Sequence, residues 1–339
     1  MDVKNVFLNG FIMEDIYFEQ PQGLENFYFS NHVFKLKKVL YGLKQAPRPW
    51  YDRLKTFLIE NDFNVDKIDT TLVIKRKGKD ILLVQIYVDH IIFDAINKSV
   101  CKKFVKCMQD EFVMSIMREL NFFFGLQIKQ ARDEIFINQS KCIKDLIKTF
   151  GMEHAKKVDT SMETSTKLTM EGNGKNIDIT KYQGMIGSLL YLTTSRPDIM
   201  FCVCLCAHFQ ACPQKSHVVI VKFIFRYLHG TIDLRMWYSK RSELNLINYL
   251  DADFAGYKVD RKNTSGIFHF LGSSLVSWAS NKQNSIALST TKAEYIMAGS
   301  CCAKILWMKQ TLKDFGLNFD HVIVMCDSTS TISLPKNPI

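Results

Sequence analysis

The chain has 339 residues, which exceeds what one compact core usually holds, so we expect two or three domains. Hydrophobic residues make up 47% and charged residues 23% of the sequence, values typical of globular proteins that exclude global disorder. The 44 Lys and Arg residues against 34 Asp and Glu residues leave a formal net charge of +10, which favours polyanionic partners such as nucleic acid.

The first part of the chain alternates strand and helix patterns. Residues 1–8 are consistent with a strand, and residues 47–60 carry apolar side chains at helical spacing. Residues 81–88 form an apolar run of strand length, which Asp89 and His90 separate from a second apolar stretch. This pattern predicts a hairpin with polar residues at its turn. The alternation of strands and helices indicates an α+β fold.

The second part begins with a change of composition. Residues 156–181 are rich in Thr, Ser, Gly, Asn and Lys without a sustained period, which predicts a linker or a surface crossing. The elements predicted after it are helices at 182–194, 197–209 and 213–228, strands at 246–251, 265–271 and 274–280, a long helix at 291–315 and a strand at 322–326.

Neither a membrane span nor a secretion signal is expected. The longest apolar run, residues 199–207, is well short of the roughly 18 residues that a membrane span needs. The first dozen residues are too polar for a signal peptide, so we expect an intracellular protein, cytoplasmic or nuclear. The ten cysteines show no CxxC spacing, which favours free thiols packed as small hydrophobic side chains.

Acidic residues at strand ends are the candidates for phosphoryl transfer, because a pair of divalent cations needs carboxylates that converge from separate strands. In the first half these are Asp2 and Asp89. An Asp at a hairpin turn more often serves turn hydrogen bonding, and this alternative stays open for Asp89.

Three further carboxylates lie in the second half. Asp251 ends an apolar strand, Glu294 lies in the first predicted turn of the long helix, and Asp327 follows the last strand. These positions allow the three side chains to converge on one metal pair. Taken singly, Glu294 could instead stabilise its helix N-terminus electrostatically, and Asp327 could be a helix cap.

Several long motifs resemble the reverse transcriptase of copia-type retrotransposon polyproteins. They are MDVKNVFLNG at 1–10, EQPQG at 19–23, LKKVLYGLKQAPR at 36–48, YVD at 87–89, FFFGLQI at 122–128 and TSRPDI at 194–199. A second group resembles the ribonuclease H of the same family: YLDADFAG at 249–256, RKNTSG at 261–266, VSW at 276–278 and ALSTTKAEY at 287–295. The resemblance covers nearly the whole chain.

The resemblance implies an architecture and a set of partners. It implies an α+β reverse transcriptase palm without fingers, thumb-like and connecting helices, and a truncated, mixed α/β ribonuclease H-like domain. We place the palm and thumb-like region at 1–155, the linker and connection helices at 156–244, and the ribonuclease H-like domain at 245–339. The partners implied are RNA, DNA and RNA–DNA hybrid, with deoxynucleotide triphosphates as substrates of the parent family and no membrane. The implied cofactor is Mg²⁺ or Mn²⁺.

The resemblance also assigns roles to individual residues. Asp2 and Asp89 correspond to polymerase metal ligands, and Phe7 to the bulky residue that screens the 2′ position of the incoming sugar. Three residues match the loop and helix start that pack on template and nucleotide: Tyr41, Gly42 and Lys44. Three more match the ligands that activate water to cleave the RNA strand of an RNA–DNA hybrid: Asp251, Glu294 and Asp327.

The polymerase motif departs from the family pattern at one ligand. The family has Tyr-Val-Asp-Asp at the hairpin, and here His90 stands at the position of the last aspartate. Mg²⁺ prefers oxygen ligands, so metal affinity is expected to fall. Conversion to a zinc centre is disfavoured, because the nearby sequence offers no second His or Cys with suitable spacing.

Both predicted modules are expected to lack parts of the family pattern. The resemblance begins at the strand bearing Asp2, so the fingers that position the triphosphate are expected to be missing. Asp2 also lies close to a chain end, where order requires pinning by a sheet. The fourth ribonuclease H carboxylate has no counterpart here, although Asp253 lies on the same strand face as Asp251 and could partly compensate.

The expected function is therefore that of a copia-type reverse transcriptase and ribonuclease H fragment without measurable polymerase activity. The alternatives are a surviving hybrid-specific ribonuclease, a non-catalytic nucleic-acid-binding module and a decayed reading frame without a selected role. The binding alternative depends on basic residues interleaved with aromatic ones, which could track phosphates and stack on bases. They are Lys35, Lys37, Lys38, Lys44 and Arg48, with Phe34, Tyr41, Trp50 and Tyr51.

Overall fold

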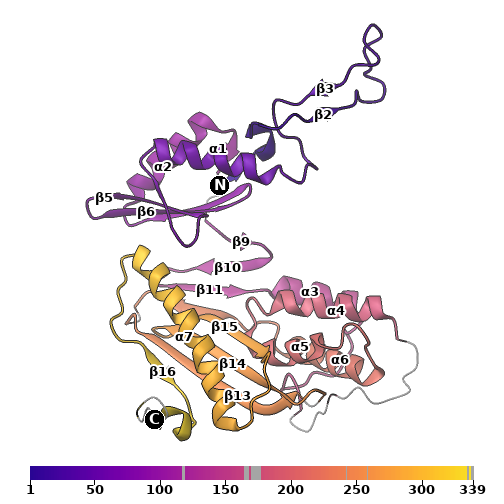
Figure 1. The fold of residues 1–339 in the computed structure, drawn as a ribbon, viewed down its shortest axis with the longest axis vertical. Coiled ribbons are helices and arrows are strands. Elements are labelled where there is room, and N and C mark those ends of the chain that lie inside the picture. The colour runs from indigo at the N-terminus through magenta and orange to yellow at the C-terminus, as the bar shows by residue number, and fades with distance from the viewer. Residues whose placement is uncertain are drawn as a thin grey trace. The chain divides into compact units, whose positions relative to one another are not determined.

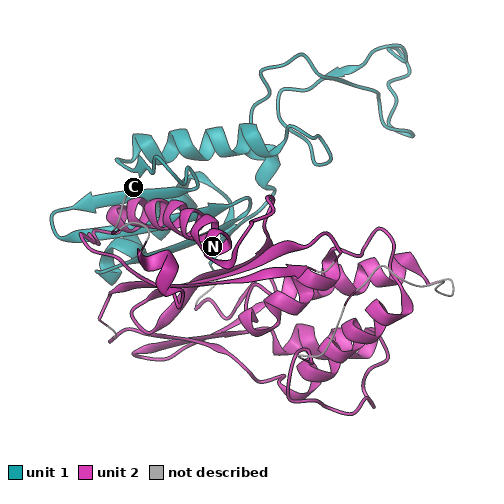
Figure 2. Ribbon diagram, turned by 60° about the horizontal axis from the view of Figure 1, so that its bottom comes forward, with its two compact units in different colours: residues 1–118 teal, residues 119–339 magenta. Residues whose placement is uncertain are grey.

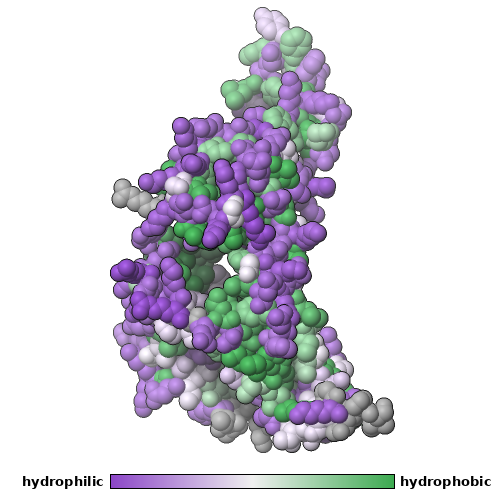
Figure 3. All heavy atoms as spheres, turned by 90° about the vertical axis from the view of Figure 1, so that its left-hand side faces the viewer, coloured by the Kyte–Doolittle hydropathy of each residue, from purple (hydrophilic) through white to green (hydrophobic). Residues whose placement is uncertain are grey.

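The computed structural model describes most of the chain and divides it into two compact units (Figures 1 and 2). Unit 1 comprises residues 1–118 and unit 2 residues 119–339. The described residues are 1–116, 119–163, 168, 177–241, 243–257, 259–333 and 336. Among them, no helix combines the length and the apolar character that crossing a bilayer requires. On the face shown in Figure 3, hydrophilic residues surround smaller hydrophobic areas.

Unit 1 is built on a six-stranded sheet with the order β4-β5-β6-β7-β1-β8. Its strands are β1 (Asp2–Val3), β4 (Asn64–Val65), β5 (Leu72–Lys77), β6 (Asp80–Tyr87), β7 (His90–Ala95) and β8 (Met114–Ser115). Its helices are α1 (Pro47–Glu60), α2 (Lys98–Glu111) and the short 3-10 helix η1 (Val6–Asn9), and a separate two-stranded sheet pairs β2 (Tyr17–Phe18) with β3 (Phe34–Lys35). Both long helices pack on one face of the sheet, because Trp50 and Leu54 of α1 and Phe104 of α2 share a buried core with Val84 of β6.

The helix predicted at 47–60 and the predicted hairpin are confirmed, with two differences in detail. The turn of the hairpin is Val88–Asp89, and His90 is already the first residue of β7, paired with Tyr87. The strand predicted over residues 1–8 is wrong beyond Val3. Asn5 adopts a left-handed backbone conformation with φ of 49°, which ends the strand and turns the chain into η1.

Unit 2 contains two four-stranded sheets and a group of helices. One sheet has the order β12-β11-β10-β9, and the other has the order β15-β14-β13-β16. The strands are β9 (Phe122–Phe123), β10 (Leu126–Gln130), β11 (Glu134–Asn138), β12 (Met236–Ser239), β13 (Leu246–Tyr257), β14 (Lys262–Leu271), β15 (Ser274–Lys282) and β16 (Ile323–Met325). The helices are α3 (Ser140–Thr149), α4 (Ile179–Leu192), η2 (Pro197–Ile199), α5 (Met200–Ala207), α6 (Lys215–Gly230), α7 (Thr290–Asp314) and α8 (Thr329–Ser333).

Two buried clusters organise unit 2. Helices α3 to α6 share one cluster, to which α3 contributes Ile143 and Ile147. Helix α7 covers one face of the sheet, where its Ala293 and Met297 pack with Leu250 of β13. Because side chains alternate along a strand, the residues of β13 on either side of Leu250 point to the opposite face. This alternation places the acidic residues of β13 away from α7.

The three helices predicted between residues 182 and 228 and the long helix predicted at 291–315 are confirmed within a few residues. The strand predicted at 246–251 continues to Tyr257, so Asp251 lies inside β13 rather than at its end. Most of the linker predicted at 156–181 lies outside the described residues, and α4 begins at its end. The mixed α/β character is thus confirmed, while the division into three functional domains stays a prediction.

Candidate functional sites

The first candidate site lies where β1, β7 and β8 of unit 1 meet. The sheet register places Asp2 opposite His90 on β7 and opposite Ser115 on β8. Asp89 occupies the adjoining turn, and ligand atoms of Asp2, Asp89 and His90 all lie within 4.8 Å of one another. The structure therefore brings Asp2 and Asp89 together, with the imidazole beside them. All three residues are partly buried.

Backbone hydrogen bonds hold Asp2 in place although it is near the first residue of the chain. The amino group of Met1 donates to the Ile91 carbonyl over 2.8 Å, and the Val3 amide donates to the Asp89 carbonyl over 2.9 Å. The sheet thereby supplies the pinning that the sequence analysis required for an ordered Asp2.

The carboxylates of this site already have charged or polar neighbours. Lys4 Nζ lies 3.1 Å from Asp2 Oδ2, and the Ser115 hydroxyl donates to the same oxygen over 3.4 Å. His90 Nδ1 lies 2.7 Å from Asp89 Oδ1. Only two of the three clustered side chains offer oxygen, so the set fits Mg²⁺ poorly.

The residues matched to the nucleotide pocket are partly grouped. The rings of Phe7 and Tyr41 pack edge to face with centroids 4.9 Å apart. Gly42 has φ of 92°, a left-handed conformation that a side chain would strain, and Lys44 is exposed. Phe7 and Tyr41 therefore form one aromatic surface.

The proposed stacking role of Trp50 is wrong. Its side chain is only 1% exposed, and its indole nitrogen donates to the Val88 carbonyl over 2.7 Å. Trp50 thereby supports the turn that carries Asp89.

Two of the basic residues predicted to track phosphates are paired with carboxylates. Lys35 lies 2.5 Å from Asp15, and Arg48 lies 3.9 Å from Asp52.

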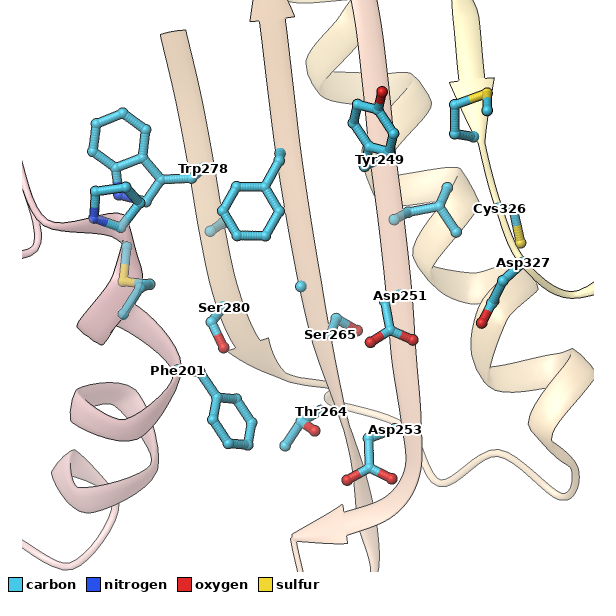
Figure 4. Close-up of a pocket in the computed structure, with 17 residues that line it drawn as sticks. Phe201, Tyr249, Asp251, Asp253, Thr264, Ser265, Trp278, Ser280, Cys326 and Asp327 are labelled. Carbon is cyan, nitrogen blue, oxygen red and sulfur yellow. The ribbon is translucent and has the colours of Figure 1, made fainter. Parts of the chain in front are cut away.

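The second candidate site is a cavity of about 820 Å³ in unit 2 (Figure 4). Asp251 and Asp253 project into it from the face of β13 that α7 leaves open. Asp327 lines the cavity from the segment that follows β16. Strand β16 itself pairs in parallel with β13. The structure thus brings Asp251 and Asp327 together from neighbouring strands, as the sequence analysis expected.

Glu294 joins this group from α7. Its Oε1 accepts the Ala252 amide over 3.0 Å, and its side chain is buried, with the residue 5% exposed. The helix begins at Thr290 after a Ser289 cap, so Glu294 lies in the second turn rather than the first. This position weakens the alternative in which Glu294 stabilises the helix N-terminus.

The alternative role of Asp327 as a helix cap is not supported. The hydroxyl of Ser328, not the Asp327 carboxylate, accepts the Thr331 amide at the start of α8, over 3.3 Å. The Asp327 carboxylate instead lines the cavity beside Asp251 (Figure 4).

Burial and neighbouring charges raise the pKa of two carboxyl groups of the second site, Asp251 and Glu294. Burial, followed by the charges of Asp327 and Asp253, raises the pKa of Asp251. Burial also raises the pKa of Glu294, with the charges of Asp251 and Asp327 adding to it and the Ala252 amide opposing it. A bound cation would relieve this repulsion.

Two features of this site were missed by the sequence analysis. Cys326 lines the cavity and lies against Glu294, a contact between residues 32 positions apart. A row of aromatic side chains, Tyr249, Phe268 and Trp278, crosses three strands next to the acidic residues. The two-residue spacing between Tyr249 and Asp251 is a signal that could have placed them on one face, but the cross-strand partners depend on register.

Comparison with known proteins identifies relatives over the whole chain. A family model described as "Reverse transcriptase (RNA-dependent DNA polymerase)" matches residues 1–164. The Pol polyprotein from transposon RE1 of Arabidopsis thaliana is 34% identical over 100% of this chain and 23% of its own length. The Pol polyprotein from transposon RE2 of the same plant is 33% identical over the same shares. The Pol polyprotein from transposon TNT 1-94 of Nicotiana tabacum is 34% identical over 99% of this chain and 26% of its own length. The chain thus spans about a quarter of these relatives.

Proposed function

Because the chain belongs to the copia-type retrotransposon Pol polyproteins and carries a reverse transcriptase domain, we propose that unit 2 cleaves the RNA strand of RNA–DNA hybrids. Unit 1 is, in this proposal, a polymerase palm that no longer extends primers. The observation that carries the proposal is that Asp251 and Asp327 line one cavity, while Glu294 accepts the Ala252 amide of β13 and has a ligand atom within 4.8 Å of one on Asp327.

The donor set of unit 2 fits a hard divalent cation. Asp251, Glu294 and Asp327 supply carboxylate oxygens, which Mg²⁺ and Mn²⁺ prefer, and Asp253 adds a further carboxylate on the same face. Paired cations, when bound, would activate a water and stabilise the charge that develops on the phosphate.

The protein groups of unit 2 have separable roles in this proposal. Asp251 and Asp327, which line the cavity, would hold cations there, and these cations would offset the repulsion between the carboxylates and a phosphate backbone. Glu294 is kept in one orientation by the Ala252 amide, so it presents a fixed oxygen to the site. A nucleic-acid strand would approach through the cavity on the face of β13 away from α7.

Unit 1 retains only part of a polymerase site. Asp2 and Asp89 would bind the catalytic cation, Phe7 would screen the sugar, and Tyr41 with Gly42 and Lys44 would contact the template and nucleotide. His90 replaces an oxygen ligand by a nitrogen, which weakens the hold on Mg²⁺. We therefore propose that this unit is inactive in nucleotide addition.

The ribonuclease proposal is tested with a labelled RNA–DNA hybrid, the full chain and Mg²⁺. Asp251→Asn is expected to lower the cleavage rate by roughly 100-fold or more, because a metal ligand is lost. Asp320→Asn changes an exposed Asp of the same unit outside the cavity and should cleave like the parent. Equal cleavage by both variants, or cleavage of single-stranded RNA alone, would contradict the proposal.

Primer extension tests the proposal for unit 1. With an RNA template, a DNA primer and either Mg²⁺ or Mn²⁺, no extension is expected, since the site offers too few oxygen ligands. Template-dependent extension that Asp2→Ala abolishes would show that the palm still works.

A further inference from the structure

A sulfur ligand lies among the carboxylates of unit 2. The segment after β16 brings Cys326 and Asp327 next to Glu294 in the second turn of α7. Ligand atoms of these three residues all lie within 4.8 Å of one another. They come from two elements that the fold holds together, so the donors are placed before any ion arrives.

The second carboxylate oxygen of the buried Glu294 side chain, Oε2, has only a weak hydrogen-bond partner among the described residues to offset its loss of water. Glu294 Oε1 accepts the Ala252 amide at 3.0 Å, whereas Oε2 lies 3.8 Å from the Cys326 sulfur. A thiol is a weak donor, and this distance is long even for sulfur. A buried carboxylate oxygen in such a setting is stabilised by a cation shared with its neighbours.

The mixture of donors selects the kind of cation. Mg²⁺ takes oxygen ligands and gains nothing from sulfur, whereas Zn²⁺ binds Cys together with carboxylates and keeps an open position for water. We propose that Glu294, Cys326 and Asp327 form a binding site for a thiophilic divalent cation of the Zn²⁺ class. On binding, the thiol proton passes to solvent and the sulfur coordinates the metal.

The site has a regulatory consequence, which rests on the proposed ribonuclease function. Glu294 and Asp327 are also two of the carboxylates assigned to the Mg²⁺-dependent reaction. A Zn²⁺ ion anchored by Cys326 engages both of them, so it competes with the ions that support cleavage. Micromolar zinc then inhibits the enzyme, and Cys326 is the residue that confers this sensitivity.

The binding site is tested by cobalt spectroscopy on the full chain without nucleic acid. Co²⁺ bound to a thiolate absorbs in the near ultraviolet through sulfur-to-metal charge transfer. We expect this band to saturate at one equivalent, to disappear on adding Zn²⁺ and to persist in excess Mg²⁺. Cys326→Ser and Cys326→Ala should both remove it, whereas Cys302→Ser, at an exposed position of α7, should retain it. A band that survives both Cys326 substitutions overturns the site.

Zinc inhibition of hybrid cleavage tests the regulatory consequence. In Cys326→Ser, the zinc concentration that halves the Mg²⁺-dependent rate should rise by roughly tenfold or more, because sulfur is replaced by a poorer zinc ligand. Unchanged sensitivity would overturn the inhibitory role. If the parent chain cleaves no hybrid, the proposed function fails, while the cobalt band still decides whether the metal site exists.

Discussion

In the polymerase site that we propose for unit 1, His90 stands at the position of one ligand. It lies beside Asp89 and opposite Asp2, where a third carboxylate would complete the oxygen donors. The backbone that would present such a carboxylate is already in place, because β7 pairs with β1 and the Trp50 indole supports the turn. At this position the difference is therefore one of donor chemistry rather than of backbone placement.

We predict that His90→Asp raises the Mn²⁺ affinity of the full chain at a site that depends on Asp2. The gain should be on the order of tenfold, because an anionic oxygen ligand replaces a neutral nitrogen. Mn²⁺ titration followed by electron paramagnetic resonance measures it. His32→Asp is the matched control at an exposed position of unit 1. An equal gain in the control would show that added charge, rather than ligand position, raises the affinity.

Asp251 is predicted to destabilise the folded chain at neutral pH. Burial and the charges of Asp327 and Asp253 raise its pKa in the folded state, so the folded protein binds more protons than the unfolded one. This penalty is absent below the unfolded pKa, grows as the pH rises from the unfolded toward the folded pKa, and is complete above the folded pKa. Because solvent screens the exposed Asp251 carboxylate, Asp251→Asn should increase the free energy of unfolding at pH 7 only modestly, by about 0.2–1 kcal/mol.

Urea denaturation at several pH values measures this effect. The gain from Asp251→Asn should shrink toward zero as the pH falls below the unfolded pKa, and Asp320→Asn, at an exposed position outside the cavity, is measured alongside it as the control. A loss of stability at pH 7 would mean that the Asp251 carboxylate makes a favourable interaction in the folded state.

At the scale of elements, a buried arginine joins the helices of unit 2. The Arg196 guanidinium is 1% exposed, lies 2.6 Å from Asp198 in η2 and donates to the Thr231 carbonyl just after α6 over 3.0 Å. It therefore ties the start of α5 to the end of α6. The α5 side of this junction also lines the cavity through Phe201.

Arg196→Met is predicted to lower the free energy of unfolding by about 3 kcal/mol or more, because it leaves Asp198 and the Thr231 carbonyl without their donor. Urea denaturation monitored by circular dichroism measures this loss. Arg132→Met, at an exposed position of the same unit, should change stability by about 0.5 kcal/mol at most. Similar losses in both variants would argue against a specific role for the junction.

At the scale of the whole molecule, the net charge of +10 favours attraction to nucleic acid independently of cleavage. We predict that the logarithm of the association constant for an RNA–DNA hybrid falls linearly with the logarithm of the salt concentration between about 50 and 200 mM. Fluorescence anisotropy in EDTA measures it without cleavage. Asp251→Asn should leave the slope unchanged, because the slope depends on Lys and Arg contacts with phosphates and Asp251 is not a cation. A flat salt dependence would exclude binding driven by charge.

Local sequence patterns determined most elements of both units. Helical spacing predicted α1 and α7, and the polar interruption at Asp89 predicted the β6–β7 hairpin. Alternation along β13 placed Asp251 and Asp253 on one face. These features depend on the period of neighbouring residues, so they can be read without knowledge of the fold. The resemblance to copia-type polyproteins, which the comparisons confirm, could likewise be recognised from contiguous motifs.

Only the tertiary structure decided which residues meet. Helical spacing assigned Trp50 to a face but could not say that this face is buried and supports the turn of Asp89. The contact of Cys326 with Glu294 joins a strand end to a helix across 32 positions, and the aromatic row depends on the register of three strands. Such contacts arise from strand order and from which face each helix covers, and these are set by packing of the whole unit rather than by local periodicity.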